Sequence, residues 1–92
     1  MTSTADAYLA RARDEIAALD VRLLATINAR IRKVAELYRF KQEHDLPRID
    51  PEREAWLTAY LQRVNRGPLS DEGVKELLAF VLDLVKREVA RD

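Results

Sequence analysis

The first half of the sequence contains no glycine or proline between Thr4 and Glu43. Without a helix-breaking residue, this stretch predicts one continuous helix of roughly 40 residues, about 60 Å long. At about 100° per residue, two cations fall among apolar residues on a single face of this helix. That face carries Leu19, Leu23, Arg30, Val34, Leu37 and Lys41, and a second stripe carries Arg13, Leu24, Ile31 and Tyr38.

Two apolar stripes on one long helix limit how the chain can fold. The remaining residues cannot cover both stripes, so a single copy would leave much apolar surface in contact with water. We therefore expect a second copy of the chain to cover it. A length of 92 residues is at the low end for a stable core, and there is no cysteine to reinforce it. The sequence predicts one domain over residues 1–92 that forms a homodimer.

The composition narrows the class of protein further. Two glycines, three prolines and 35% charged residues favour an all-α fold over a sheet, which needs more turns. Sixteen basic and sixteen acidic residues give a net charge of zero, so we expect no nucleic-acid partner. The longest apolar run, Leu77 to Leu82, is too short to span a membrane, and the N-terminus lacks the order of a signal peptide. We expect a soluble, cytoplasmic protein without a membrane partner.

Turn and cap residues divide the chain into three predicted helices, over about residues 4–43, 51–65 and 71–90. Proline at position 47 disfavours helix in the residue before it, which ends the first helix near His44. Asp50 is a favourable N-cap for the second helix, and Pro51 takes the first helical position. Ser70 is the expected N-cap of the third helix.

Apolar residues on the second and third helices predict the core. Trp56 and Tyr60 share one face of the second helix, where a core position is the simplest expectation. The inward face of the third helix is predicted to carry Val74, Leu77, Leu78, Val81, Leu84 and Val85, with Glu88 in the same stripe.

Charged residues inside apolar stripes are the candidate functional residues, because an unpaired buried charge is costly. The candidates are Arg13, Arg30, Lys41, Glu52 and Glu88. Arg30 and Lys41 lie on one face about 16 Å apart along the helix, while Arg13 lies about 25 Å from Arg30 and cannot reach the same point. An antiparallel second copy would bring its Arg13 between them and so create two pockets per dimer. Solvated side chains on a helix surface remain the alternative for each residue taken singly.

The order of these residues resembles the all-helical (AroQ) class of chorismate mutases. The resemblance is carried by Arg13, Ala18-Leu19-Asp20, Arg30, Lys41, Pro47, Asp50-Pro51-Glu52-Arg53-Glu54 and Gly67-Pro68-Leu69-Ser70. It implies an intertwined dimer of three-helix chains. It also implies an isomerase of aromatic amino acid biosynthesis, in the shikimate pathway, that rearranges chorismate to prephenate without a metal or a cofactor.

The resemblance also implies roles for single residues. Arg30, with Arg13 of the partner subunit, would bind the two carboxylates of chorismate. Lys41 would donate to the ether oxygen, which gains negative charge as the C–O bond breaks. Glu52 would accept a hydrogen bond from the ring hydroxyl. Catalysis would then be electrostatic and conformational.

Two positions depart from the family pattern. Arg48, a candidate substrate-binding residue, stands where many relatives carry an acid or an amide. Relatives place a glutamine, or in some branches a glutamate, late in the third helix as a second donor to the ether oxygen. The apolar phase favours Glu88 for that role, whereas counting from Leu69 and Ser70 favours Val89.

Other functions are compatible with the same pattern. An isochorismate pyruvate lyase or an aminodeoxychorismate mutase would use a similar cationic pocket on the same fold. A non-catalytic helical dimerisation or regulatory module would explain the long first helix equally well. The pairing of Arg30 and Lys41 on one stripe argues against that module, because a dimer seam needs no buried cations.

Overall fold

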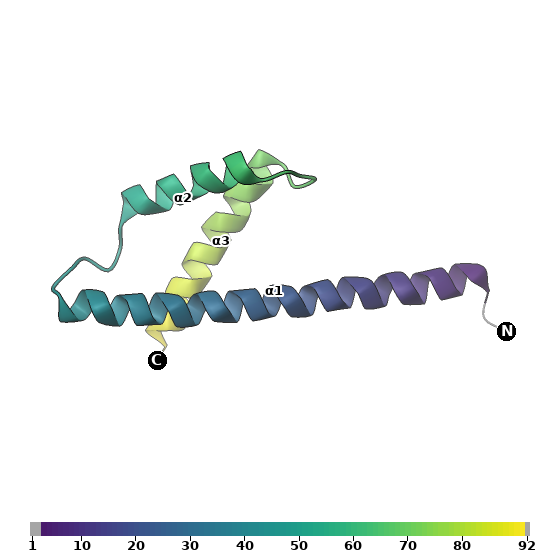
Figure 1. The fold of residues 1–92 in the computed structure, drawn as a ribbon, viewed down its shortest axis with the longest axis horizontal. Coiled ribbons are helices and arrows are strands. Elements are labelled where there is room, and N and C mark those ends of the chain that lie inside the picture. The colour runs from purple at the N-terminus through teal and green to yellow at the C-terminus, as the bar shows by residue number, and fades with distance from the viewer. Residues whose placement is uncertain (1–2, 92) are drawn as a thin grey trace. The chain divides into compact units, whose positions relative to one another are not determined.

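The computed structural model describes residues 3–91 and shows three helices joined by two short connections (Figure 1). Helix α1 spans Thr4–Glu43, α2 spans Pro51–Val64 and α3 spans Asp71–Ala90. Over the described residues there is no strand, so the predicted all-α, three-helix chain is confirmed. None of these helices has the length and apolar character needed to cross a membrane. The chain divides into two units between Arg30 and Ile31, and each unit is described by itself.

The first unit is the N-terminal part of α1, which is capped by a side chain. The hydroxyl of Ser3 accepts a hydrogen bond from the backbone N–H of Asp6 at 3.0 Å, which satisfies one of the helix's unpaired donors. No residue of α1 is buried in the single chain. Its apolar stripes lie open to solvent, with Leu19 58% and Leu24 64% exposed. An exposed apolar helix face of this kind is typical of an interaction surface.

The second unit begins within α1, which ends in a Schellman motif. The backbone N–H of Leu46 donates to the carbonyl of Lys41 at 2.8 Å, and that of Asp45 donates to the carbonyl of Gln42 at 3.4 Å. Asp45 adopts the left-handed conformation that this motif requires, with φ of 55°. Aspartate tolerates this conformation better than most residues, although glycine adopts it most readily. The chain therefore leaves the helix at Asp45, two residues before Pro47.

The left-handed conformation of Asp45 leads to a prediction about stability. Asp45→Gly is expected to leave the free energy of unfolding unchanged or to raise it, because glycine has no Cβ to strain. Asp45→Val is expected to lower it by about 1–2 kcal/mol, since a β-branched residue fits this conformation poorly. Urea denaturation followed by circular dichroism would measure both. Equal stabilities for the glycine and valine variants would contradict the end of α1 described here.

Helices α2 and α3 start at the N-caps expected from the sequence. The Asp50 carboxylate accepts from the N–H of Arg53 at 3.1 Å, and Pro51 occupies the first turn. The Ser70 hydroxyl accepts from the N–H of Gly73 at 3.0 Å. Helix α2 ends at Val64, with Asn65 as its C-cap, and Gly67 follows with a φ of 75°.

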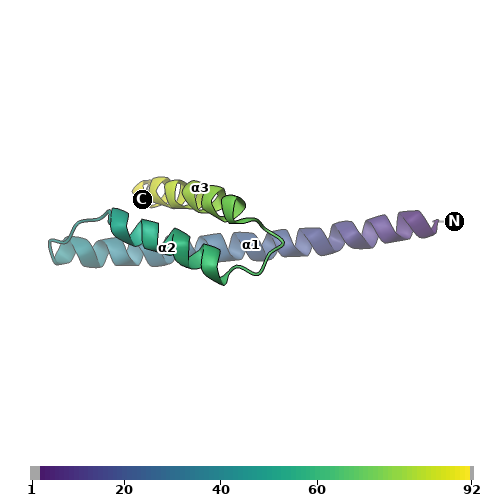
Figure 2. The ribbon, with the colours of Figure 1, turned by 90° about the horizontal axis from the view of Figure 1, so that it is seen from above.

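Helices α2 and α3 contact each other, and their axes are inclined to one another (Figure 1 and Figure 2). The buried residues are Val74, Leu78 and Val85, all from α3. Lys86 of α3 forms a salt bridge with Glu54 of α2 that ties the two helices together across this contact. Two core expectations are wrong for the single chain, because Leu77 is 46% and Trp56 47% exposed. Instead of packing in the core, Trp56 stacks on Tyr60 and carries the Arg53 guanidinium on its ring.

Candidate active site

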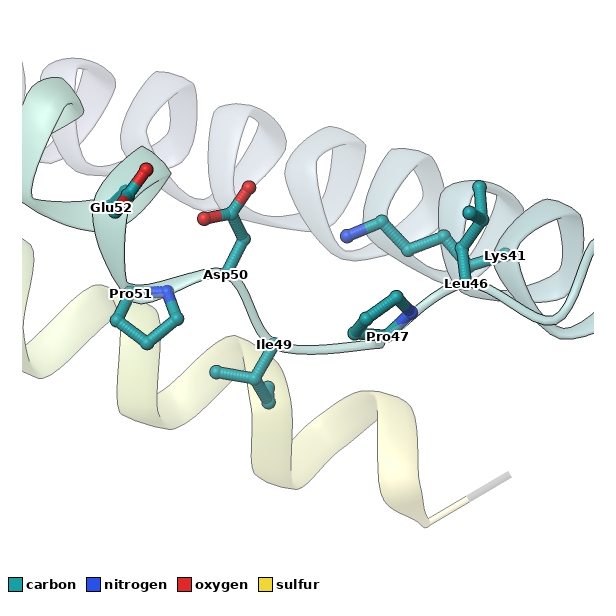
Figure 3. A pocket seen from close by; sticks show the side chains of 7 residues that line it. All are labelled: Lys41, Leu46, Pro47, Ile49, Asp50, Pro51 and Glu52. Carbon is teal, nitrogen blue, oxygen red and sulfur yellow. The ribbon is translucent and has the colours of Figure 1, made fainter.

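A cavity of about 710 Å³ lies where α1 passes into α2. It is lined by Lys41, Leu46, Pro47, Ile49, Asp50, Pro51 and Glu52. Its volume falls within the range that holds a small organic molecule. Figure 3 shows the Lys41 side chain extending toward the Asp50 carboxylate, with Glu52 beyond it on the first turn of α2. The polar ends of three side chains thus gather at a cavity with an otherwise apolar wall.

Lys41 is the cation of this cavity, and the last turn of α1 presents it there. Its side chain is half-buried. Its ammonium group donates a hydrogen bond to the carbonyl oxygen of Arg48 at 3.1 Å. An ammonium group has three N–H donors, so two remain for a bound molecule. Lys41 is therefore placed to donate to an oxygen atom in the cavity.

Two carboxylates share the cavity with Lys41. Glu52 lies in the first turn of α2 and is exposed, so its oxygens can accept a hydrogen bond from a ligand. Asp50 is occupied in part by its N-cap bond to Arg53. These residues bring one positive and two negative charges to the cavity. A dianionic ligand would be bound here only if further cations joined the site.

The Arg48 side chain does not line the cavity. Its guanidinium carbon lies 4.6 Å from the centroid of the Tyr38 ring, within the range of a cation–π contact. Its backbone carbonyl, in contrast, is the acceptor for Lys41. Arg48 thus reaches the site through its main chain.

Arg13 and Arg30 belong to the first unit of the chain. Arg13 is exposed and Arg30 is half-buried. Neither forms a salt bridge with a residue that the structure describes. Their place in the site therefore stays a prediction.

Glu88 lies on the last turns of α3 and is half-buried. Its carboxylate pairs at 3.0 Å with Arg91, the C-cap residue that follows α3. Neither Glu88 nor Val89 lines the cavity beside Lys41.

Asp50 lines the cavity although it was not among the predicted site residues. The sequence predicted it as the N-cap of the second helix and as part of the segment that carries the family resemblance. Its closeness to Glu52 in the sequence was the available signal. Glu54 is half-buried and paired with Lys86, and it does not line this cavity. Among residues 3–91, no group of three or more histidine and carboxylate side chains is arranged to hold a metal ion.

Comparison with known families identifies the fold. A family model described as chorismate mutase type II matches residues 12–89, which is most of the chain. The chain belongs to the chorismate mutase type II family. The prediction of an isomerase of the chorismate mutase class is thereby confirmed.

Two solved structures of chorismate mutase from Thermus thermophilus are similar to the chain. Form II is 29% identical with a TM-score of 0.86, and the match covers 92% of this chain and 97% of that one. Form I is 31% identical with a TM-score of 0.82, and the match covers 85% of this chain and 98% of that one. The comparison with curated proteins gives no match. Most of the three-helix chain thus corresponds to nearly the full length of these two chorismate mutase chains.

Membership of the chorismate mutase family allows a test of which residue late in α3, Glu88 or Val89, donates to the ether oxygen of the substrate. If Glu88 donates to the ether oxygen, Glu88→Gln should retain or increase kcat/KM near neutral pH, because an amide donates at every pH. Glu88→Ala should lower kcat/KM at least threefold, about 0.7 kcal/mol. Val89→Gln is the matched variant. If Val89→Gln raised kcat/KM and the Glu88 variants left it unchanged, residue 89 would hold the position of the donor.

Proposed function

We propose that this chain is a chorismate mutase that rearranges chorismate to prephenate in a pocket shared by two subunits. The observation that carries the proposal is the position of Lys41, whose ammonium group is held at the cavity by one hydrogen bond and has two further N–H donors without a partner among residues 3–91. The family match supplies the reaction class. The proposed enzyme is a single domain that acts in the cytoplasm.

The charge of the cavity favours a site completed by other residues. Chorismate carries two carboxylates, and the cavity residues alone carry an excess of one negative charge. Arg30 and Arg13 of the partner subunit would reverse that sign, and each guanidinium can bind a carboxylate through two parallel hydrogen bonds. The exposed apolar stripes of α1 provide a surface on which a second copy could lie.

Each residue would then have one task in a concerted rearrangement. The two arginines would hold the side chain of chorismate over its ring, in a geometry close to that of the transition state. Lys41 would stabilise the negative charge that develops on the ether oxygen as the C–O bond breaks. Glu52 would accept from the ring hydroxyl. A millionfold acceleration requires about 8 kcal/mol, which positioning and two or three charged contacts can provide.

The direct test is incubation of the purified protein with chorismate. We expect the absorbance of chorismate to decrease and prephenate to be the product. Release of pyruvate from isochorismate, with chorismate left intact, would instead indicate a lyase on the same fold. An amino analogue rearranged in preference to chorismate would indicate an aminodeoxychorismate mutase. No turnover of any of the three would favour a non-catalytic dimerisation module.

The shared pocket predicts an obligate homodimer. Sedimentation equilibrium at micromolar concentration is expected to give about twice the chain mass of 10.6 kDa. The physical reason is the exposed apolar surface of α1, which a single copy does not cover. A stable, fully active monomer would contradict both the dimer and the shared pocket.

A further inference from the structure

The connection between α1 and α2 contacts α1 through two different parts of Arg48. The carbonyl oxygen accepts from the Lys41 ammonium at 3.1 Å. The guanidinium lies over the Tyr38 ring at 4.6 Å. Tyr38 and Lys41 are three residues apart on α1, so their side chains are neighbours on the helix surface. One residue of the connection is thus held between two adjacent side chains of the helix.

A lysine side chain needs such support before it can act with precision. Its four-carbon stem is flexible, and its ammonium group has no preferred direction of its own. The hydrogen bond to the Arg48 carbonyl removes part of that freedom. The position of this carbonyl depends in turn on how firmly the connection between α1 and α2 is held. The contact of the Arg48 guanidinium with Tyr38 fixes that connection next to the lysine.

We propose that Tyr38 and Arg48 are positioning residues for Lys41, and that Arg48 acts through the Tyr38 ring and its own carbonyl and not by binding the substrate. The inference rests on the proposed function, because it takes Lys41 as the group that contacts the reacting oxygen. It assigns a role to Tyr38, and it replaces the role in substrate binding expected for Arg48. The cavity lining, which excludes the Arg48 side chain, supports this assignment.

The kinetic test uses Tyr38→Leu, Arg48→Leu and the double variant. Each single change is expected to lower kcat about two- to fivefold, the range of one exposed cation–π contact, with KM changed less than about twofold. The double variant should lose no more than the larger single loss, because both changes break the same contact. Tyr38→Phe keeps the aromatic ring and should therefore retain most of the wild-type kcat. Arg63→Leu is the matched control, because Arg63 lies over Tyr60 on α2 at 5.6 Å from the ring centroid.

A different kinetic pattern would overturn the proposal. A rise in KM for Arg48→Leu, with Tyr38→Leu at wild-type activity, would show that the guanidinium binds the substrate. Losses that multiply in the double variant would show that the two residues act independently.

A second measurement does not depend on catalysis. Brief treatment with acetic anhydride, followed by mass spectrometry, would compare acetylation of Lys41 with that of Lys33 in the same sample. Lys33 is the internal reference, because its side chain is exposed and pairs only with Glu36 on the same helix. The ratio for Lys41 is expected to rise at least about twofold in Tyr38→Leu and Arg48→Leu, since the ammonium loses its fixed acceptor. An unchanged ratio would overturn the positioning role. If the wild-type protein did not convert chorismate, the proposed function would be wrong. The acetylation ratio would still show whether Tyr38 and Arg48 hold the Lys41 ammonium in place.

Discussion

Lys41→Ala is expected to lower kcat/KM for chorismate by about 10²- to 10³-fold, the usual loss when one donor to a developing negative charge is removed. The loss should fall mainly on kcat, because the ether oxygen gains its charge only as the bond breaks. Steady-state kinetics on the purified variant would measure it. Folding should be retained, because Lys41 is half-buried and its ammonium has a single main-chain partner.

Lys33→Ala is the control for this prediction. Lys33 lies on the same helix, is 78% exposed and forms only a surface ion pair with Glu36. Surface pairs of this kind contribute little, so its kcat/KM should stay within about twofold of the wild type. A loss below about tenfold for Lys41→Ala would show that Lys41 does not contact the reacting oxygen.

The second large effect is expected when two inactive variants are mixed. Arg13→Ala and Lys41→Ala should each be inactive as homodimers, because every pocket lacks one cation. In a mixed dimer, one of the two pockets would have Arg13 from one chain and Lys41 from the other. After unfolding and refolding of an equal mixture, half of the dimers are mixed, so about a quarter of the wild-type activity should return.

A matched mixture makes this experiment decisive. Arg30 and Lys41 are proposed to serve the same pocket from the same chain. A mixture of Arg30→Ala and Lys41→Ala should therefore recover no activity, although mixed dimers form as readily. Recovery in both mixtures, or in neither, would contradict the assignment of Arg13 to the partner subunit.

The helical parts of the fold could be predicted because they depend on local chemistry. A stretch without glycine or proline forms α1, and the capping side chains of Asp50 and Ser70 begin α2 and α3. The end of α1 was harder to predict in detail. Its left-handed residue is Asp45, whereas glycine is the usual signal for such an end.

The cavity could be predicted only in part. Lys41 and Glu52 were recognised as candidates, and the structure brings both to one cavity. The Arg48 carbonyl that holds Lys41 could not be predicted, because no side-chain pattern reports the direction of a backbone carbonyl in a connection. Trp56 was expected in the core because it shares a helix face with Tyr60, but its ring is exposed, stacks on Tyr60 and carries the Arg53 guanidinium.

Lys41 makes two hydrogen bonds with the connection that follows α1. Its own carbonyl accepts from the N–H of Leu46, and its ammonium donates to the carbonyl of Arg48. The main-chain carbonyl and the side-chain ammonium group of Lys41, the residue proposed to act on the substrate, thus both hold the connection. Opening this short segment would remove the acceptor of Lys41 while leaving the rest of the helices intact, and local opening needs less free energy than global unfolding. On heating, catalysis should therefore be lost at a lower temperature than helical structure.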